Sequence, residues 1–280
     1  MRLKTFTVIT WAALTLLLIG KTSPLDQGVL FGPENGSLVI VGGGGIPDEI
    51  IEKFIELAGG PDAPIVIVPT AGGRDTYDQD DRSRGMFERA GATALTILHT
   101  YDPMEAEREE FVEPLLRASG VWFPGGRQWR LTDAYMGTRT YQEFHNVLAR
   151  GGVIGGSSAG ASIQASYMVR GAPEGNRIMM AEGHEIGFSF LKNSAVDQHI
   201  DARQRESDLK EVLDRYPELL GIGLYEGTAV IVKGDEFVVM GRGMVAISDS
   251  FREQGEGEEF YYLLSPGEKF DLRKRKVIPR

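Results

Sequence analysis

Short apolar segments alternate with amphipathic segments over more than a hundred residues, and this alternation constrains the fold more than any other feature of the sequence. Apolar runs of strand length are predicted at 38–41, 65–68, 94–98, 121–123 and 153–154. Segments of helical period separate them, at 47–58, 80–90, 105–119 and 140–149. This order predicts an α/β fold, a doubly wound and mostly parallel sheet with helices on both faces.

The pattern changes after residue 200. Residues 203–216 are predicted to form one more helix, and short β-rich runs follow at 221–224, 229–232, 237–240 and 245–247. The turn Lys233-Gly234-Asp235 is typical of a hairpin between two such runs. We therefore expect a C-terminal antiparallel extension of the same domain.

The N-terminus predicts the compartment. Arg2 and Lys4 precede an apolar run at about 6–19, which is typical of a secretory signal peptide. A membrane-spanning helix needs about 20 apolar residues, so an uncleaved anchor remains the alternative. We expect a signal peptide or anchor over 1–22, a linker over 23–36 and one folded domain over 37–280. The protein is then secreted or periplasmic, or held at a membrane by its N-terminal segment.

Charge and cysteine content exclude several classes of function. The formal net charge of −10 argues against a nucleic-acid partner, which usually requires a broad basic face. The chain contains no cysteine, which excludes thiol nucleophiles, disulfides and thiolate metal sites. No H-E-x-x-H motif is present, so the sequence predicts no metal site.

Gly156, Ser158 and Gly160 form a G-x-S-x-G motif directly after the strand predicted at 153–154. In a nucleophile elbow the chain turns sharply from strand to helix at the serine, whose hydroxyl projects beside free N–H groups. The alternative is a Gly/Ser-rich turn without chemistry. Other predicted strands also end in glycine clusters, at 42–45, 72–73 and 125–126. Because sites gather at the carboxyl ends of parallel strands, this convergence favours a nucleophilic Ser158.

A serine nucleophile needs a base, and histidine is the usual one because it titrates near neutrality. The chain has four histidines, namely His99, His145, His184 and His199. The position of His199 at the end of a short predicted strand favours it over the other three.

An acid should orient the imidazole, but the pattern alone leaves its identity open. The candidates are Glu174, Glu182, Glu185, Asp197 and, further along the chain, Glu226. Asp197 lies two residues before His199 on the same side of an extended strand, and this position suits a substrate contact better.

The glycine turn at 42–45 is not a dinucleotide-binding fingerprint, because Pro47 and Asp48 stand where the third glycine of G-x-G-x-x-G would be required. We expect it to serve tight packing or a close approach of the backbone to a ligand.

The chain resembles the cyanophycinase family, a group of serine exopeptidases that includes aspartyl dipeptidase. The matching segments lie in family order over about 37–250, at 41–45, 123–128, 156–161, 197–205 and 221–229. The resemblance implies a fold related to class I glutamine amidotransferases and no metal or cofactor.

The resemblance also assigns roles. It implies Ser158 as nucleophile, His199 as general base and Glu174 as the nearest match to the acid, with Glu226 as the other candidate. Backbone amides of Gly126 and Ala159 are expected to form the oxyanion hole. The expected substrate-binding residues are Gln128, Asp197, Gln198, Arg203, Arg205 and Glu226.

Three positions depart from the family pattern. Arg127 replaces the usual Asp or Asn beside Gln128, Tyr225 replaces an acid before Glu226, and Asp208 replaces an arginine. The change at Asp208 reverses a local charge where family members recognise β-aspartyl-arginine, so it puts specificity for cyanophycin in question.

We therefore expect an exported serine-type exopeptidase of the cyanophycinase type that hydrolyses β-aspartyl or related acidic peptide linkages through an acyl-enzyme. The alternative is a catalytically inert binding protein on the same fold. The expected partner is a peptide, with cyanophycin and β-aspartyl dipeptides as candidates. The sequence does not determine which peptide is cleaved, whether the protein forms a homodimer, or whether the leader is removed.

Overall fold

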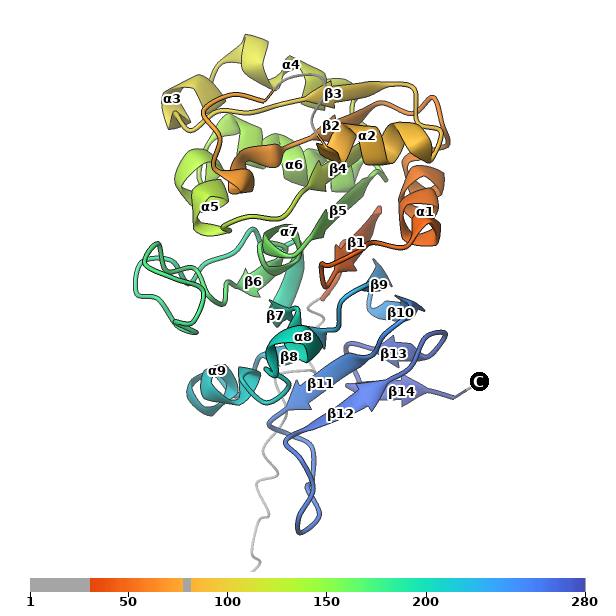
Figure 1. The fold of residues 1–280 in the computed structure, drawn as a ribbon, viewed down its shortest axis with the longest axis vertical. Coiled ribbons are helices and arrows are strands. Elements are labelled where there is room, and N and C mark those ends of the chain that lie inside the picture. The colour runs from red at the N-terminus through yellow and green to blue at the C-terminus, as the bar shows by residue number, and fades with distance from the viewer. Residues whose placement is uncertain (1–30, 78–81, 280) are drawn as a thin grey trace, which may run out of the picture.

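The computed structural model describes residues 31–77 and 82–279. The predicted signal peptide or anchor and the first part of the predicted linker, residues 23–30, lie outside this range. Along the described part of the chain, no helix combines the length and apolar character needed to cross a membrane. Figure 1 shows the arrangement of the elements.

The central sheet has the strand order β14-β13-β10-β9-β1-β5-β4-β2-β3. Its parallel part is formed by β1 (Ser37–Val41), β5 (Val153–Ser157), β4 (Gly120–Phe123), β2 (Ile65–Ile67) and β3 (Leu95–Ile97). The strands β9 (Thr228–Lys233), β10 (Glu236–Gly241), β13 (Lys269–Asp271) and β14 (Lys276–Ile278) extend it antiparallel from β1. The predicted α/β fold with its antiparallel extension is confirmed.

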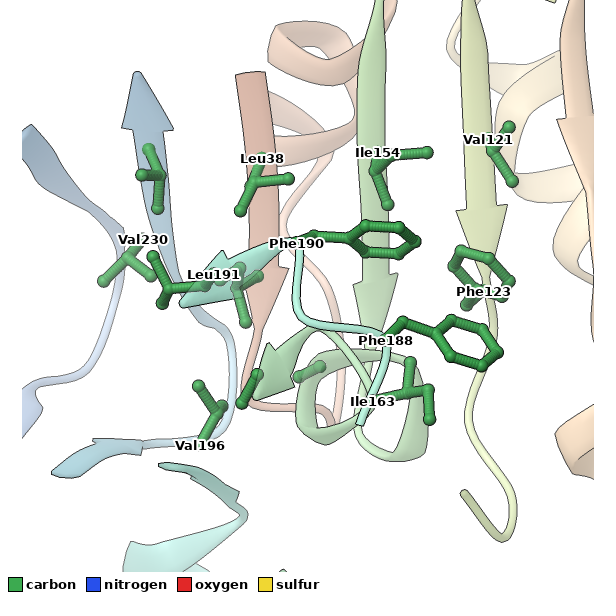
Figure 2. Close-up of a cluster of buried hydrophobic side chains, with 14 of the residues drawn as sticks. Leu38, Val121, Phe123, Ile154, Ile163, Phe188, Phe190, Leu191, Val196 and Val230 are labelled. Atoms are coloured by element: carbon green, nitrogen blue, oxygen red, sulfur yellow. The ribbon is translucent and has the colours of Figure 1, made fainter. Parts of the chain in front are cut away.

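Helices cover both faces of this sheet. One face carries α1 (Asp48–Ala58) and α2 (Arg82–Arg89), and α4 (Glu109–Arg117) and α6 (Arg139–Ala149) lie against the other. The alternation along β1 produces this division, because Val39 and Val41 pack with Phe54 of α1 while Leu38 and Ile40 face the opposite cluster. Figure 2 shows part of that second cluster, where Phe188 and Phe190 lie against one face of the central strands.

A second sheet lies beside the first, with the order β12-β11-β8-β7-β6. Its members are β6 (Ala165–Tyr167), β7 (Leu191–Gln198), β8 (Leu220–Leu224), β11 (Val245–Asp249) and β12 (Tyr261–Leu264). The pairs β6–β7 and β7–β8 are parallel, and β11 runs antiparallel to β8. The runs predicted at 221–224 and 245–247 therefore belong to this sheet and not to the antiparallel extension of the central one.

Two predicted helices are divided in the structure. The helix expected at 105–119 becomes α3 (Pro103–Ala106) and α4, because Arg108 is extended at the start of α4. The helix expected at 203–216 becomes α8 (Ile200–Arg203) and α9 (Leu209–Arg215), because Gln204 adopts a left-handed conformation that ends α8. The short elements α5 (Trp129–Tyr135), α7 (Ala159–Ser162) and the 3-10 helix η2 (Pro69–Gly72) complete the order.

The end of the predicted linker is part of the folded domain. The side chain of Phe31 is buried in the core, its N–H donates to Asp235 Oδ1 at 2.7 Å, and its carbonyl accepts from the N–H of Lys192 at 2.7 Å. Phe31 therefore packs in the core although it lies within the predicted linker, because its apolar side chain finds space there.

Candidate active site

Ser158 lies at a sharp turn between β5, which ends at Ser157, and α7, which begins at Ala159. Its backbone has φ 57° and ψ −113°, a conformation that residues with a side chain rarely adopt. A Cβ on Gly160 would lie 1.8 Å from the carbonyl oxygen of Phe123, and one on Gly156 would lie 2.5 Å from that of Gly160. The two glycines are therefore required for the backbone to pass, as expected for a nucleophile elbow.

His199 follows β7 and has a left-handed backbone conformation, with φ 55°. Its N–H donates to the carbonyl of Gly42 at 3.0 Å, which fixes the residue against the turn after β1. Its ring Nε2 lies 2.9 Å from Ser158 Oγ. The structure thus brings together the two side chains that the sequence analysis paired, although forty-one positions separate them in the chain.

Glu226 lies in the turn between β8 and β9, and its Oε1 is 2.5 Å from His199 Nδ1. Its backbone N–H donates to Asp201 Oδ1 at 2.9 Å, which anchors this turn to α8. With the Nδ1 proton directed at the carboxylate, Nε2 is free to accept a proton from Ser158.

The prediction of Glu174 as the acid is wrong. Glu226 occupies the Nδ1 side of the ring, whereas Nε2 already contacts Ser158. Glu174 lies exposed in the turn after Arg170, where its charge acts on Arg127.

The glycine turn after β1 makes room for this arrangement. A Cβ on Gly43 would lie 2.3 Å from His199 Cε1, and one on Gly44 would lie 2.6 Å from Glu226 Oε2. Both glycines also have positive φ. The tight packing expected for this turn is therefore packing against the histidine and the glutamate.

The two residues expected to form the oxyanion hole flank Ser158. Ala159 is the first residue of α7, where backbone N–H groups have no partner within the helix. On the other side, a Cβ on Gly125 would lie 3.3 Å from Ser158 Cβ. Gly126 follows with φ 148°, pressed so closely on Ala71 that a Cβ would lie 2.0 Å from its carbonyl oxygen.

Comparisons with known proteins agree with this geometry. The model of peptidase family S51 matches residues 38–240. The chain belongs to peptidase family S51. A cyanophycinase from Geminocystis herdmanii is 32% identical over 206 residues, which are 72% of this chain and 75% of that protein. A cyanophycinase from Synechococcus elongatus is 30% identical over 249 residues, 82% of this chain and 76% of that protein.

Solved structures show the same fold. A peptidase from an acI-B1 actinobacterium has a TM-score of 0.66 at 23% identity, over 86% of this chain and 99% of that chain. A putative peptidase E from Listeria monocytogenes has a TM-score of 0.54 at 14% identity, over 74% and 99% of the two chains. Membership in family S51 makes the protein a serine exopeptidase that acts on a peptide.

In this S51 peptidase, Asp197 and Gln128, two of the residues expected to bind the substrate, form hydrogen bonds within the protein instead. Asp197 is fully buried, and its two carboxylate oxygens accept from Arg170 Nε at 2.8 Å and Nη2 at 2.7 Å. The substrate-binding prediction for Asp197 is therefore wrong. Gln128 is also buried, and its Nε2 donates to the carbonyls of Val169 at 2.7 Å and Arg170 at 3.0 Å.

The remaining predicted substrate residues include polar groups that have no hydrogen-bond partner among the described residues. Among the described residues, no partner is found for the buried atoms Gln198 Oε1 and Arg205 Nη1. Burial lowers the pKa of Arg205, and the nearby charge of Arg170 lowers it further. Arg203 is exposed at the end of α8. These groups could contact a polar ligand on the α8 side of the triad, whereas Glu226 is directed at His199.

Sequence reasoning missed Arg170, which explains the most conspicuous departure from the family pattern. Its Nη2 donates to Asp208 Oδ2 at 2.7 Å as well as to Asp197. Burial alone would lower the pKa of Arg170, but the bonds to Asp197 and Asp208 outweigh it and the pKa is raised. The carboxylate of Asp208 is thus neutralised within the protein. No sequence signal links Arg170 to a residue thirty-eight positions away.

The other two departures lie near this region. Arg127 Nη2 donates to the carbonyl of Ala172, and burial and the charge of Arg130 lower its pKa. Burial raises the pKa of the Tyr225 hydroxyl, with nearby Glu206 acting in the same direction.

The other histidines contact groups away from Ser158. His99 Nδ1 lies 2.9 Å from Thr70 Oγ1, and His184 Nε2 lies 2.9 Å from Asp133 Oδ1. His145 packs between the rings of Tyr141 and Phe190. Within residues 31–77 and 82–279, no group of three or more His, Cys, Asp or Glu side chains is placed to hold a metal ion.

Proposed function

We propose that this S51 peptidase is exported and hydrolyses β-aspartyl or related acidic peptide linkages through an acyl-enzyme on Ser158. The observation that carries the proposal is the row of hydrogen bonds from Ser158 Oγ to His199 Nε2, at 2.9 Å, and from His199 Nδ1 to Glu226 Oε1, at 2.5 Å. This is the arrangement of a serine nucleophile, a base and an orienting acid.

This geometry supports the following catalytic steps. His199 Nε2 takes the hydroxyl proton while Ser158 Oγ attacks the scissile carbonyl carbon, and Glu226 stabilises the imidazolium. Amides of Gly126 and Ala159 hold the oxyanion, each donor contributing about 3 kcal/mol. His199 then protonates the leaving nitrogen as the C–N bond breaks. A water molecule, deprotonated by His199, attacks the acyl-enzyme, and the proton returns to Ser158 as the acid product leaves.

The charges beside the triad support an acidic substrate. Arg203 is exposed and Arg205 keeps a guanidinium nitrogen without a partner among the described residues. Guanidinium groups bind carboxylates through two parallel hydrogen bonds. Asp208, the one acidic departure there, is already bonded to Arg170. The two named relatives are cyanophycinases, so a β-aspartyl linkage is the first candidate.

Export is supported by the N-terminal pattern of Arg2, Lys4 and the apolar run at 6–19, together with the absence of cysteine. Expression of the full chain followed by cell fractionation and N-terminal sequencing tests it. A processed protein outside the cytoplasm is expected. An unprocessed protein in the membrane fraction would favour the anchor, and an unprocessed cytoplasmic protein would contradict export.

The catalytic proposal is tested with cyanophycin and a panel of paired α- and β-aspartyl dipeptides. The wild type should hydrolyse β-linked substrates, and Ser158→Ala should lower kcat/KM by at least about 10⁴-fold without changing the thermal unfolding midpoint. Ser162→Ala, in the same helix, is the matched control and should keep full activity. Unchanged hydrolysis by Ser158→Ala, or a preference for α-linked peptides, would contradict the proposal. Binding without turnover would favour an inert binding protein.

A further inference from the structure

A cavity of about 520 Å³ lies on the α1/α2 face of the central sheet, at the carboxyl ends of its strands. Gly44, Gly125 and Ser157 line it at the strand ends, and α2 contributes Arg82, Met86 and Arg89. The volume is in the range of sites that hold a small ligand or part of a peptide.

The walls of this cavity touch the triad. A Cβ on Gly44 would lie 2.6 Å from Glu226 Oε2, and a Cβ on Gly125 would lie 3.3 Å from Ser158 Cβ. Ser157 directly precedes the nucleophile. The backbone of Gly44 therefore lies between the cavity and Glu226, and the backbone of Gly125 lies between the cavity and Ser158.

The charge of the cavity is positive. Arg82, Met86 and Arg89 are spaced by four and three residues, so they form one stripe along α2. Both arginines are exposed, and no ion pair is found for either within the described part of the chain. Asp48, in the first turn of α1, is the acidic residue of the lining. Among the described residues of the lining, two guanidinium groups accompany one carboxylate, in a chain whose formal net charge is −10.

The cavity and Arg203 lie on different sides of the strand ends. Arg203 ends α8, which packs on β8, and Figure 1 shows α8 and α2 on opposite sides of the ends of β1 and β5. Ser158 directly follows β5. A peptide with its scissile carbonyl at Ser158 has one segment on each side of that carbon, so one segment extends toward α8 and the other toward α2.

We propose that this cavity is a second substrate subsite, in which Arg82 and Arg89 bind a side-chain carboxylate of an acidic peptide on the side of the scissile bond opposite Arg203 and Arg205. This inference rests on the proposed peptidase function. It defines the substrate class more closely, because the peptide must then carry acidic groups on both sides of the cleaved bond.

The test uses a series of peptides with one β-aspartyl bond and a further Asp beyond the bonded residues on each side, and each of these outer Asp residues is changed in turn to Asn. The wild type should lose about 10- to 100-fold in kcat/KM when the cavity-side Asp is replaced, as expected for one charged hydrogen-bonded contact. The double variant Arg82→Gln/Arg89→Gln should show that loss with the acidic peptide, chiefly through KM, and no further loss with the cavity-side Asn peptide. Arg203→Gln/Arg205→Gln should instead lower kcat/KM for the peptide that keeps the Asp on the other side of the cleaved bond, with no further loss when that Asp is already Asn.

Arg108→Gln/Arg139→Gln, which removes two exposed arginines paired with Glu110 and Glu109, is the charge-matched control and should leave the preference unchanged. The subsite would be overturned if the wild type cleaved the Asp and Asn peptides equally well. It would also be overturned if the double variant lost kcat/KM to the same extent with both peptides.

A binding measurement separates this inference from the proposed function. Ser158→Ala should bind the acidic peptide at least about 10-fold more tightly than Ser158→Ala/Arg82→Gln/Arg89→Gln in calorimetric titrations. Equal affinities would overturn the subsite whether or not the wild type cleaves. Failure of the wild type to hydrolyse any peptide, with the affinity difference intact, would instead reject the peptidase mechanism and leave the acidic-peptide site standing.

Discussion

Two clusters of hydrogen-bonded polar side chains flank the end of β7. In the first, His199 joins Ser158 to Glu226, and in the second, Arg170 joins Asp197 to Asp208. The contact distances are alike, from 2.5 to 2.9 Å. Their central groups differ in exposure, because the His199 side chain is 12% exposed whereas Arg170 and Asp197 are 2% and 0% exposed. The outer carboxylates Glu226 and Asp208 are alike, at 39% and 40%.

Residues with an unusual backbone conformation occur in both clusters. Ser158 and His199 both have positive φ, and glycines that leave no space for a Cβ surround them. Such strain persists where the surrounding structure enforces it, and it collects at functional sites. Arg170 shares a positive φ, but its side chain is saturated by internal partners. Access to a ligand, and not the strength of the pairing, therefore distinguishes the site from the structural ion pair.

The largest expected effect is on activity when the first cluster is broken. His199→Ala should lower kcat/KM by at least about 10⁴-fold, and Glu226→Gln by about 10²- to 10⁴-fold, because the imidazole loses its base or its orientation. Glu174→Gln is the matched control and should stay within about 2-fold of the wild type. Steady-state kinetics on the best substrate checks this. Equal losses in the two glutamate variants would show that Glu226 has no special role.

Breaking the second cluster should affect stability instead. Arg170→Met leaves the carboxylate of Asp197 buried without a cation, with only the backbone N–H of Gln198 among its described partners, and should lower the free energy of unfolding by about 3–5 kcal/mol. Arg139→Met breaks an exposed pair with Glu109 and should cost at most about 1 kcal/mol. Urea unfolding measures both. If Arg170→Met were as stable as Arg139→Met, the buried pair would not have the structural role assigned to it.

A pair of glycine variants sharpens the comparison with a smaller effect. Gly43 and Gly60 have similar φ values, 102° and 107°, but a Cβ on Gly43 would meet the His199 ring at 2.3 Å whereas nothing lies within 4 Å of one on Gly60. Both alanine variants should lose about 1–3 kcal/mol of stability through backbone strain. Only Gly43→Ala should also lower kcat, because the ring must move. Loss of kcat in Gly60→Ala would contradict this explanation.

The smallest effect concerns pH. The pKa of Arg170 is raised, so its guanidinium group keeps its charge between pH 5 and 8. Burial lowers the pKa values of His99 and His145 below the ordinary 6.5. The unfolded chain therefore binds these protons first, and the free energy of unfolding should fall as the pH drops below about 6.5. His145→Gln should flatten this fall in urea titrations at pH 7 and pH 5. A fall as steep as that of the wild type would contradict the assignment.

The sequence predicted the parallel core because Val39 and Val41 alternate with Leu38 and Ile40 and glycines follow the strands. It also predicted the pairing of Ser158 with His199, since each ends a strand and such ends converge in a parallel sheet. The acid was missed because Glu226 lies in a turn whose position depends on the second sheet, which the sequence analysis did not foresee. Proximity along the chain favoured Glu174 instead.

The same reason explains the error at Asp197. The strand pattern placed its side chain on the same side as His199, but its partner Arg170 comes from the loop after β6, and local pattern carries no record of that contact. Buried ion pairs between distant residues are therefore the part of this molecule that only the folded structure reveals.

The most direct test of the account is labelling of the intact protein with a fluorophosphonate, followed by mass spectrometry of the peptides. The account predicts a single rapid modification at Ser158 in the wild type, slowed at least about 10²-fold in His199→Ala and unchanged in rate in Arg139→Gln. Labelling at another serine, or at Ser158 with the same rate in the wild type and in His199→Ala, would contradict it.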